Sequence, residues 1–415
     1  MDFSLSDHQL LIRDTVREFM NAEVRSHVKD WEKSEYFPLE IIKKLGTMGC
    51  CGMLTPEEWG GPGLDTISYV LMIEEVARVH TAISTALAVT NSAVQLPLVT
   101  FATDEQKKRY LKPLASGEII GAFCLTEPQA GSDAAGIQSR ATRGTVAPAS
   151  SEPRTDGALG SDQPPYVLSG TKTWVTNGSA AGVFIVFAKT NPEAGGKGIT
   201  AFLVEPTFPG LKVGRHEEKM GQRCSPSVEI ILNDCIVPAA NRLGEEGQGL
   251  KIALSALDGG RIGIAAQAVG LGQGALDEAA KYARSRKAFG KSIAEFQAIQ
   301  WMLADMHTEI EAARALLYQA AFLKDRASAG APGAVVAPGI FDPAMKMGSA
   351  ASRAKLYASE MVNRVAYKAV QIFGSQGYSR ESEVERIYRD ARVISIYEGT
   401  SEIQRTIIAR DLLAK

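Results

Sequence analysis

The sequence predicts an α+β protein in which a helical region, a β region and a second helical region follow one another along 415 residues. Apolar residues recur at helical spacing up to about residue 120 and again, almost without a break, from 247 onward. The intervening segments are short, rich in β-branched and aromatic residues, and bounded by turn residues. This order differs from the alternation of a doubly wound sheet. We therefore expect an N-terminal α-helical domain over 1–120, a middle β domain over 121–238 and a C-terminal α-helical domain over 239–415.

The first helical region begins almost at residue 1. Ser6 can cap a helix whose apolar stripe consists of Leu10, Leu11, Val16 and Phe19. The same residues lack the apolar core of a signal peptide. Further segments carry apolar residues three and four positions apart, with Gly and Pro at the breaks between them: 38–49, 67–80 and 104–115.

The β region contains segments with the composition of strands, namely 121–128, 166–178, 182–190, 198–206 and 228–238. Two other stretches are rich in small residues and Pro, and we expect them to be surface loops: 143–165 and 327–340. No internal repeat of fixed period is present.

The composition excludes several classes of protein. A formal charge of −2 argues against a nucleic-acid binder, and no apolar run long enough for a transmembrane helix is evident. Five cysteines without a C-x-x-C pattern fit a reducing compartment. The five histidines have no metal-ligand spacing, so we expect no metal site. Neither a G-x-S-x-G elbow nor a P-loop is present.

The segment 396–405 (IYEGTSEIQR) is the most informative part of the chain. It places the carboxylate of Glu398 on a Gly turn directly before a helix, where Ser401 with Gln404 predicts a capping box. A helix start offers free N–H groups and partial positive charge to an anion. Glu398 is therefore a candidate base beside an anion site. A surface turn before an amphipathic helix explains these residues equally well.

Six motifs in a fixed order extend this interpretation over nearly the whole chain: LTEPQAGSD at 125–133, GTKTWVTNG at 170–178, LDGGRIGIAAQA at 257–268, SRKAFG at 285–290, QIFGSQGY at 371–378 and YRDARVISIYEGTSEIQR at 388–405. In these motifs the chain resembles the acyl-CoA dehydrogenase family, and most of all its short-chain (butyryl-CoA) and short branched-chain members. The resemblance implies a middle β-barrel or sandwich domain, a C-terminal four-helix bundle and FAD as cofactor.

For catalysis, the resemblance implies that Glu398 removes the α-proton of an acyl-CoA while a hydride passes from the β-carbon to the flavin, which gives a trans-2-enoyl-CoA. Some members carry the base at the position before the CoA-facing arginine. That position is Gly260 here, so the alternative base is missing. Of the other nearby acids, Glu402 is expected to contact the flavin cofactor and Asp390 to form a structural ion pair.

The resemblance also implies contacts to cofactor and substrate. The residues expected to contact FAD within one chain are Phe123, Leu125, Thr126, Ser132, Trp174, Thr176, Thr400 and Glu402. Those expected to contact the acyl-CoA are Ser132, Asp258, Arg261, Tyr397 and Gly399. Without their motifs, Trp174 would be interpreted as a core aromatic residue and Arg261 as a solvated helix residue.

A further set resembles residues that reach the FAD of a neighbouring subunit: Arg286, Phe289, Gln297, Gln371, Gly374 and Ser375. A cofactor shared between chains implies an obligate homotetramer, a dimer of dimers. The family usually has a second glycine where this chain has Ser375, so the chain departs from the family pattern at this position.

The resemblance implies an electron-transferring flavoprotein as electron acceptor. Alternatives are an acyl-CoA oxidase, a dehydrogenase for an aryl- or cycloalkyl-substituted acyl-CoA, and a non-catalytic scaffold of the same fold. The floor of the acyl cavity is expected near residues 85–98, whose mostly small side chains suit a modest or branched acyl group. The N-terminus suits a bacterial cytoplasm, or the mitochondrial matrix for a mature eukaryotic protein.

Overall fold

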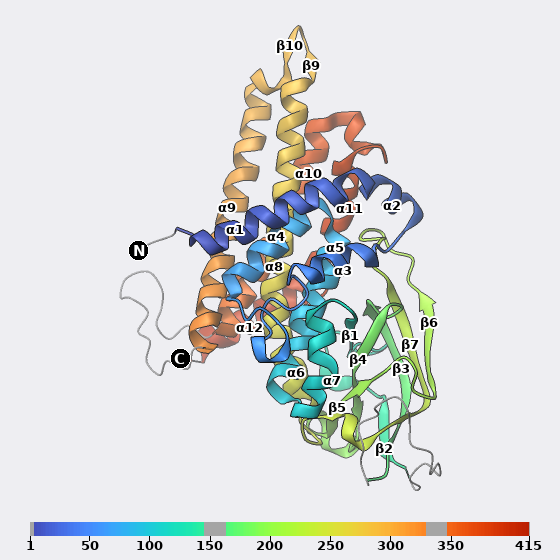
Figure 1. Ribbon diagram of the computed structural model, residues 1–415. Helices are drawn as coiled ribbons and strands as arrows, with labels where there is room; N and C mark the ends of the chain where they lie inside the picture. The colour runs from blue at the N-terminus through green and yellow to red at the C-terminus, as the bar shows by residue number, and fades with distance from the viewer. Residues whose placement is uncertain (1–3, 145–162, 329–346, 415) are drawn as a thin grey trace.

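The computed structural model describes residues 4–144, 163–328 and 347–414. Most of the two stretches expected to be surface loops, 143–165 and 327–340, therefore lies outside the described residues. Within the described residues, helices, then strands, then helices follow one another along the chain (Figure 1). The predicted α+β fold is confirmed.

The N-terminal helices pack around a common apolar core. Ser6 and Gln9 form a capping box at the start of α1, as Ser6 predicts, and Val16 is buried, whereas Leu11 is exposed. The elements are α1 (Asp7–Phe19), η1 (Met20–Val24), η2 (Arg25–His27), α2 (Val28–Ser34), α3 (Leu39–Thr47), η3 (Glu57–Trp59), α4 (Thr66–Val79), α5 (Thr81–Ala88), η4 (Val89–Gln95), α6 (Leu96–Phe101) and α7 (Asp104–Ala115).

The segment Thr81–Phe101 is the one helical stretch among the described residues that is long and apolar enough to cross a membrane. In its most apolar window, 89% of the residues are buried inside the fold, which is typical of a core helix in a globular protein. Its middle part, η4, is a π-helix, a wider turn than that of an α-helix.

The described strands of the middle part form one eight-stranded sheet in the order β6-β7-β3-β2-β4-β5-β8, with β1 paired to β4 in parallel. The two longest strands, β3 and β7, pair antiparallel, and buried apolar clusters lie on both sides of the sheet. The strands are β1 (Ile120–Cys124), β2 (Arg140–Arg143), β3 (Tyr166–Thr176), β4 (Ala181–Lys189), β5 (Ile199–Val204), β6 (Leu211–His216), β7 (Ser227–Val237) and β8 (Arg242–Leu243), with short helical turns at η5 (Ala134–Gly136), η6 (Pro192–Gly198) and η7 (Ala239–Asn241).

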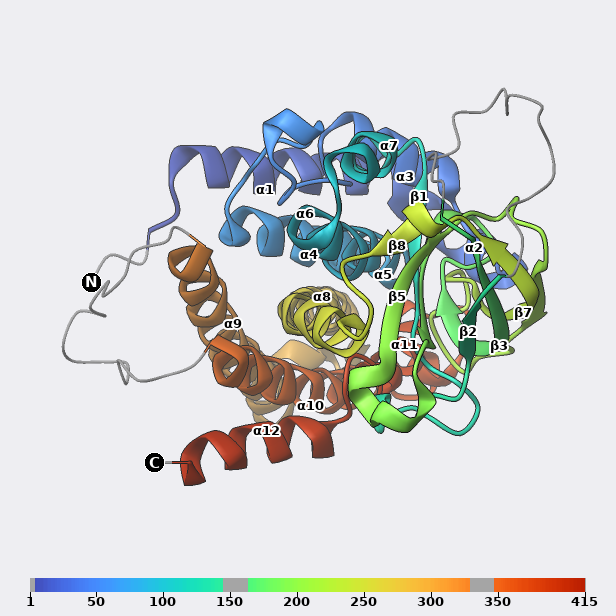
Figure 2. The ribbon, with the colours of Figure 1, turned by 90° about the horizontal axis from the view of Figure 1, so that it is seen from below.

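The C-terminal helices surround α8 (Gly249–Ser285), which lies in the centre of the molecule between α4, α9 and α10 (Figure 2). Its middle is rich in buried Ala and Gly, so its neighbours approach its backbone closely. The other elements are β9 (Lys287–Ala288), β10 (Lys291–Ser292), η8 (Ile293–Glu295), α9 (Gln297–Ser328), α10 (Met347–Phe373), η9 (Gly374–Tyr378), α11 (Glu383–Arg392), η10 (Val393–Ser395) and α12 (Ser401–Leu413).

Candidate active site

The loop between η10 and α12 carries Glu398 in a left-handed backbone conformation, with φ 53° followed by φ 88° at Gly399. Such a conformation is rare for a residue with a side chain and persists where neighbours hold it. Here Lys355 Nζ donates to the Gly399 carbonyl at 2.7 Å. Gln404 Nε2 donates to the same carbonyl at 2.9 Å and to that of Glu398 at 3.2 Å. Polar side chains on α10 and α12 therefore hold both carbonyls of the turn.

The capping box predicted from Ser401 and Gln404 is wrong. The N-cap of α12 is Thr400, whose hydroxyl accepts from the Ile403 N–H, while the Ser401 hydroxyl donates to Glu360 at 2.5 Å. Gln404 does reach backward, but it donates to carbonyls of the loop. Only Ser401 has a Gln three positions later, but the helix begins one residue earlier than this spacing predicts, and the adjacent hydroxyl of Thr400 caps it.

The Glu398 carboxylate faces the protein interior. Its Oε2 atom is buried and has no hydrogen-bond partner among the described residues. A Cβ atom added to Gly260 on α8 would lie 2.5 Å from this oxygen, so the carboxylate occupies the space that a side chain at 260 would need. Burial raises the pKa of Glu398 to about 7, while Arg261 and Lys355 oppose the rise. A surface turn is therefore excluded, and the group can accept a proton near neutral pH.

Arg261 and Asp258 form an ion pair on the same turn of α8. Arg261 is buried, which excludes a solvated helix residue, and its Nε atom has no hydrogen-bond partner among the described residues. Its guanidinium lies close enough to Glu398 to lower that carboxyl group's pKa. The predicted contacts of Asp258 and Arg261 with an acyl-CoA remain predictions.

The Tyr397 hydroxyl points into a buried polar network. It donates to the Gln267 side chain and accepts from Gln222 Nε2 at 3.1 Å. Gln267 Nε2 in turn donates to Thr85 Oγ1 at 2.6 Å, and Gln222 Oε1 accepts from the same hydroxyl at 2.7 Å. The network joins α5, α8 and the loop before β7 to the residue that precedes the candidate base. The predicted contact of Tyr397 with substrate remains a prediction. Asp390, expected in a structural ion pair, pairs with Arg386.

The two motifs expected to hold the flavin lie side by side. The Thr173 N–H donates to the Thr126 carbonyl at 2.9 Å, which joins the 125–133 loop to β3. Trp174 is 58% exposed and has φ 59°, a strained conformation for a large residue. A core aromatic residue would be buried, so that alternative is excluded. A strained, exposed indole beside the half-buried Thr126 and Thr176 suits the face of an aromatic cofactor.

Sequence reasoning missed the ion pair that fastens these motifs together. Lys172 Nζ contacts Glu127 Oε1 at 2.6 Å, and both side chains are buried. Glu127 also accepts from the backbone N–H groups of Gln138 at 2.6 Å and Ser139 at 3.0 Å. Burial alone would raise the pKa of Glu127, but Lys172 and these hydrogen bonds lower it to about 2. Both residues stand in the quoted motifs, yet nothing in the local sequence indicates that they pair 45 positions apart.

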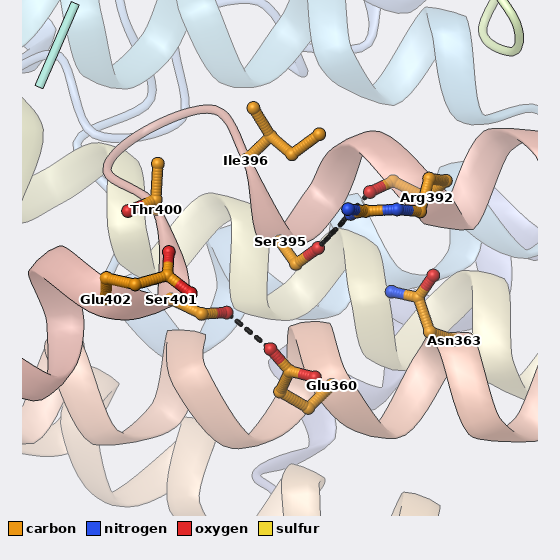
Figure 3. A pocket seen from close by; sticks show the side chains of 8 residues that line it. All are labelled: Glu360, Asn363, Arg392, Ser395, Ile396, Thr400, Ser401 and Glu402. Carbon is orange, nitrogen blue, oxygen red and sulfur yellow. Dashed lines mark hydrogen bonds between the residues drawn. The ribbon is translucent and has the colours of Figure 1, made fainter.

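The remaining predicted cofactor residues in this region differ in exposure. Leu125 is buried, Ser132 is exposed, and the Phe123 ring packs on Phe187 with centroids 4.9 Å apart. Thr400 and Glu402 line a pocket of about 320 Å³ at the start of α12, shown in Figure 3. Its other lining residues are mostly polar: Glu360, Asn363, Arg392, Ser395, Ile396 and Ser401. Among the described residues no group of acidic, His or Cys side chains has the arrangement of a metal site.

Comparison with known proteins agrees with this arrangement over the whole chain. Family models described as the acyl-CoA dehydrogenase N-terminal, middle and C-terminal domains match residues 6–118, 122–235 and 247–413. The chain belongs to the acyl-CoA dehydrogenase family. It is therefore an oxidoreductase of a flavoprotein family and an enzyme with acyl-CoA dehydrogenase activity, which excludes the non-catalytic scaffold.

Three relatives of this acyl-CoA dehydrogenase are informative. It is 42% identical over 409 residues to the short-chain-specific acyl-CoA dehydrogenase of Clostridium acetobutylicum, covering 99% of both chains. It is 41% identical over 411 residues to the caffeyl-CoA reductase-Etf complex subunit CarC of Acetobacterium woodii, again covering 99% of both. The butyryl-CoA dehydrogenase structure from Megasphaera elsdenii superposes with a TM-score of 0.89 at 39% identity and full coverage of both chains.

The remaining predicted cofactor residues of this acyl-CoA dehydrogenase lie at another end of the molecule. They are exposed, and they cluster where α8 ends, α9 begins and α10 ends, beside the β9–β10 hairpin at the top of Figure 1: Arg286, Phe289, Gln297, Gln371, Gly374 and Ser375. Along α8, residue 286 lies about 40 Å from Gly260 at 1.5 Å per residue. The structure does not bring this set to Glu398 within one chain.

Proposed function

We propose that the protein catalyses FAD-dependent α,β-dehydrogenation of a short- or branched-chain acyl-CoA to the trans-2-enoyl-CoA, with Glu398 as the base. The observation that carries this proposal is the buried Oε2 atom of Glu398, which has no hydrogen-bond partner in the described part of the chain, faces Gly260 and belongs to a group with pKa about 7. A general base works best when its pKa lies near the working pH, because it is then deprotonated yet still basic. The names of the two enzymes acting on short acyl groups support the same reaction.

FAD, when bound, would supply the hydride acceptor. The residues that fit it are the Thr126 and Thr176 segments and the exposed indole of Trp174, because they form adjoining parts of one surface. Thr400 and Glu402 would contact its adenosine part at the start of α12, where free N–H groups favour anionic ligands. Glu398 holds the proton that leaves the α-carbon, and its own N–H is the expected donor to the thioester oxygen.

The packing around α8 supports a small acyl group. A Cβ atom added to Gly259 would meet Leu96 Cδ1 at 2.7 Å and Ser92 Cβ at 3.7 Å, and one added to Gly263 would contact the Tyr69 hydroxyl. Residues of α4, η4 and α6 therefore lie close to the turn of α8 that faces the base. This close packing favours a short or branched acyl group over a long one.

We also propose that electrons pass to an electron-transferring flavoprotein and that the active form is a homotetramer. The name of the Acetobacterium woodii relative, a subunit of an Etf complex, supports such an acceptor. The exposed cofactor residues at the far end of the bundle support contact with a second chain, because they lie too far from Glu398 to share its cofactor.

The test is anaerobic addition of butyryl- or isobutyryl-CoA, which should bleach the flavin absorbance. Glu398→Gln should abolish the bleaching, whereas Glu105→Gln, an exposed acid on α7, should leave it intact. Reduction of Glu398→Gln at the wild-type rate would show that another group is the base. A panel of acyl-CoA thioesters from C4 to C16 would measure the chain-length preference.

A second candidate uses the same site with another substrate or direction. The 41% identity to a caffeyl-CoA reductase subunit favours an aryl-substituted acyl-CoA or reduction of an enoyl-CoA. Cinnamoyl-type thioesters in the same panel, assayed with a reduced flavoprotein donor, test this second candidate. Their reduction would favour it over dehydrogenation of a short acyl-CoA. Oxygen consumption in place of transfer to the flavoprotein would indicate an acyl-CoA oxidase.

A further inference from the structure

Lys355 is a buried cation that the proposed reaction does not use. Its side chain is fully buried on α10, and its Nζ atom donates a hydrogen bond to the Gly399 carbonyl at 2.7 Å. An ammonium group has three donors, and burying it is costly unless nearby groups compensate. Burial lowers the pKa of Lys355 to about 8, and Glu398 is the group that most opposes this decrease. The cation and the candidate base therefore stabilise each other's charge.

Other charged groups also face this pair. Arg261 approaches from α8, where Asp258 partly neutralises it through their ion pair. Glu360 lies on α10 with Lys355, and Glu402 lies on α12; both favour the charged lysine. Glu360 accepts a hydrogen bond from Ser401, so it also has a partner of its own. Lys355 thus differs from Arg261 because it also holds the backbone of the catalytic turn.

We propose that Lys355 is a positioning residue that fixes the Glu398–Gly399 turn through the Gly399 carbonyl and favours the ionised form of the base. This inference rests on the proposed role of Glu398. Two consequences are separable because they have different physical origins. The hydrogen bond sets the geometry of the turn and thus the limiting rate of proton removal. The charge sets the pH at which Glu398 becomes a carboxylate.

Gln404 provides a matched comparison. Its Nε2 atom donates to the carbonyls of both Glu398 and Gly399 but carries no charge. Loss of this side chain should loosen the same turn without removing a cation. A Gln404 variant is therefore expected to lower the limiting rate with little change in the pH dependence.

The experiment measures the rate of anaerobic flavin reduction by butyryl-CoA from pH 5 to 9 in four proteins: wild type, Lys355→Met, Lys355→Gln and Gln404→Met. Lys355→Gln retains an amide donor for the Gly399 carbonyl but loses the positive charge. The acidic limb of its pH–rate profile should therefore move to higher pH by about one unit. Lys355→Met should show the same displacement together with a lower limiting rate. Gln404→Met should lower the rate without displacing the limb. In Lys355→Met and Gln404→Met, kcat is expected to change more than KM.

Wild-type acidic limbs in both Lys355 variants, together with wild-type limiting rates, would overturn the positioning role. If Lys355→Met does not fold, Lys355→Gln decides alone, because its pH profile tests the charge directly. Glu398→Gln, measured in parallel, separates this outcome from failure of the proposed function. If Glu398→Gln reduces the flavin normally, the assignment of Glu398 as the base is wrong. If Glu398→Gln is inactive and the Lys355 variants behave like wild type, only the proposed role of Lys355 is wrong.

Discussion

Gly260 shows, at the scale of one residue, how the absence of a side chain makes room for the proposed base. Only hydrogen stands at this position of α8, and the Glu398 carboxylate takes the space. The contact involves the far end of a flexible side chain, so an added methyl group displaces the carboxylate without straining the helix. Alanine is also a better helix former than glycine.

Gly260→Ala should therefore reduce the rate of flavin reduction by at least about tenfold, since small displacements of catalytic groups are costly. The melting temperature should change little. The control is Gly272→Ala on the same helix, where the new methyl group meets the flexible Met361 side chain at 3.3 Å. Equal activities of the two variants would contradict this account of Gly260.

The pH dependence of the wild-type enzyme also belongs to this scale. Burial raises the pKa of Glu398 to about 7, so the group is protonated below this value and becomes a base above it. The rate of flavin reduction at low substrate concentration should rise through pH 7 and then level off, because kcat/KM reports the free enzyme. An acidic limb near pH 4.5, the ordinary value for a glutamate, would show that the carboxylate is solvated.

Single residues also mark the limits of prediction from the sequence. The motifs identify Glu398 and its helix, and the spacing of hydroxyl residues predicts a cap there, but the cap is Thr400 rather than Ser401. Lys172 and Glu127 stand within quoted motifs, but their pairing depends on which loop folds against which strand. Such information lies in tertiary contacts and not in local spacing.

At the scale of elements, periodicity predicts well where one face of a helix is buried. The segments 38–49, 67–80 and 104–115 became α3, α4 and α7 with small shifts of their ends. The stretch 81–101, part of which the resemblance gives as a helix around 85–98, has no single buried face, because it is apolar and buried throughout most of its length. A π-helical turn inside it further disturbs the helical period.

The Lys172–Glu127 pair joins β3 to the 125–139 segment, so its removal should separate two elements. Lys172→Met leaves a buried carboxylate without its cation and should lower the free energy of unfolding by about 3–5 kcal/mol. Lys44→Met is the control, because the Lys44–Glu23 pair is exposed on both sides and such pairs contribute about 0–1 kcal/mol. Urea denaturation measures both changes, and equal losses would contradict the prediction.

The same pair should make stability depend on acid. The pKa of Glu127 is about 2 in the folded chain, below an unfolded value of about 4.3. Its contribution is therefore complete above about pH 4.3 and is lost as the pH falls toward 2. Wild type should lose more stability over this window than the double variant Lys172→Met/Glu127→Leu. If the free energy of unfolding falls equally with pH in both proteins, other carboxylates dominate the acid dependence of stability.

At the scale of the whole molecule, one chain presents the Glu398 carboxylate in its middle and a second set of predicted cofactor residues at one end. Phe289 at the tip of the β9–β10 hairpin is 95% exposed, so its truncation should change the stability of an isolated chain by less than about 0.5 kcal/mol. In a tetramer it would be covered by a neighbouring chain.

Phe289→Ser should therefore decrease the mass measured by sedimentation and the amount of flavin retained after gel filtration. Leu11→Ser, a comparable exposed apolar residue on α1, should alter neither. If Phe289→Ser keeps the wild-type mass and flavin content, the hairpin does not form the interface.

The wide turn of η4 has a consequence for the evolution of the chain. Successive side chains of this segment reach different neighbours: Asn91 donates to the Cys50 carbonyl at 3.0 Å, Ser92 lies near Gly259 on α8, and Val94 lies against Gly121 on β1. A π turn holds about one more residue than an α turn, so deletion of one residue here would restore the ordinary α pitch and leave the later contacts of α6 close to their present direction. The side chains within 89–95 would change neighbours instead. A related enzyme that is one residue shorter in this helix should therefore carry its alignment gap within 89–95.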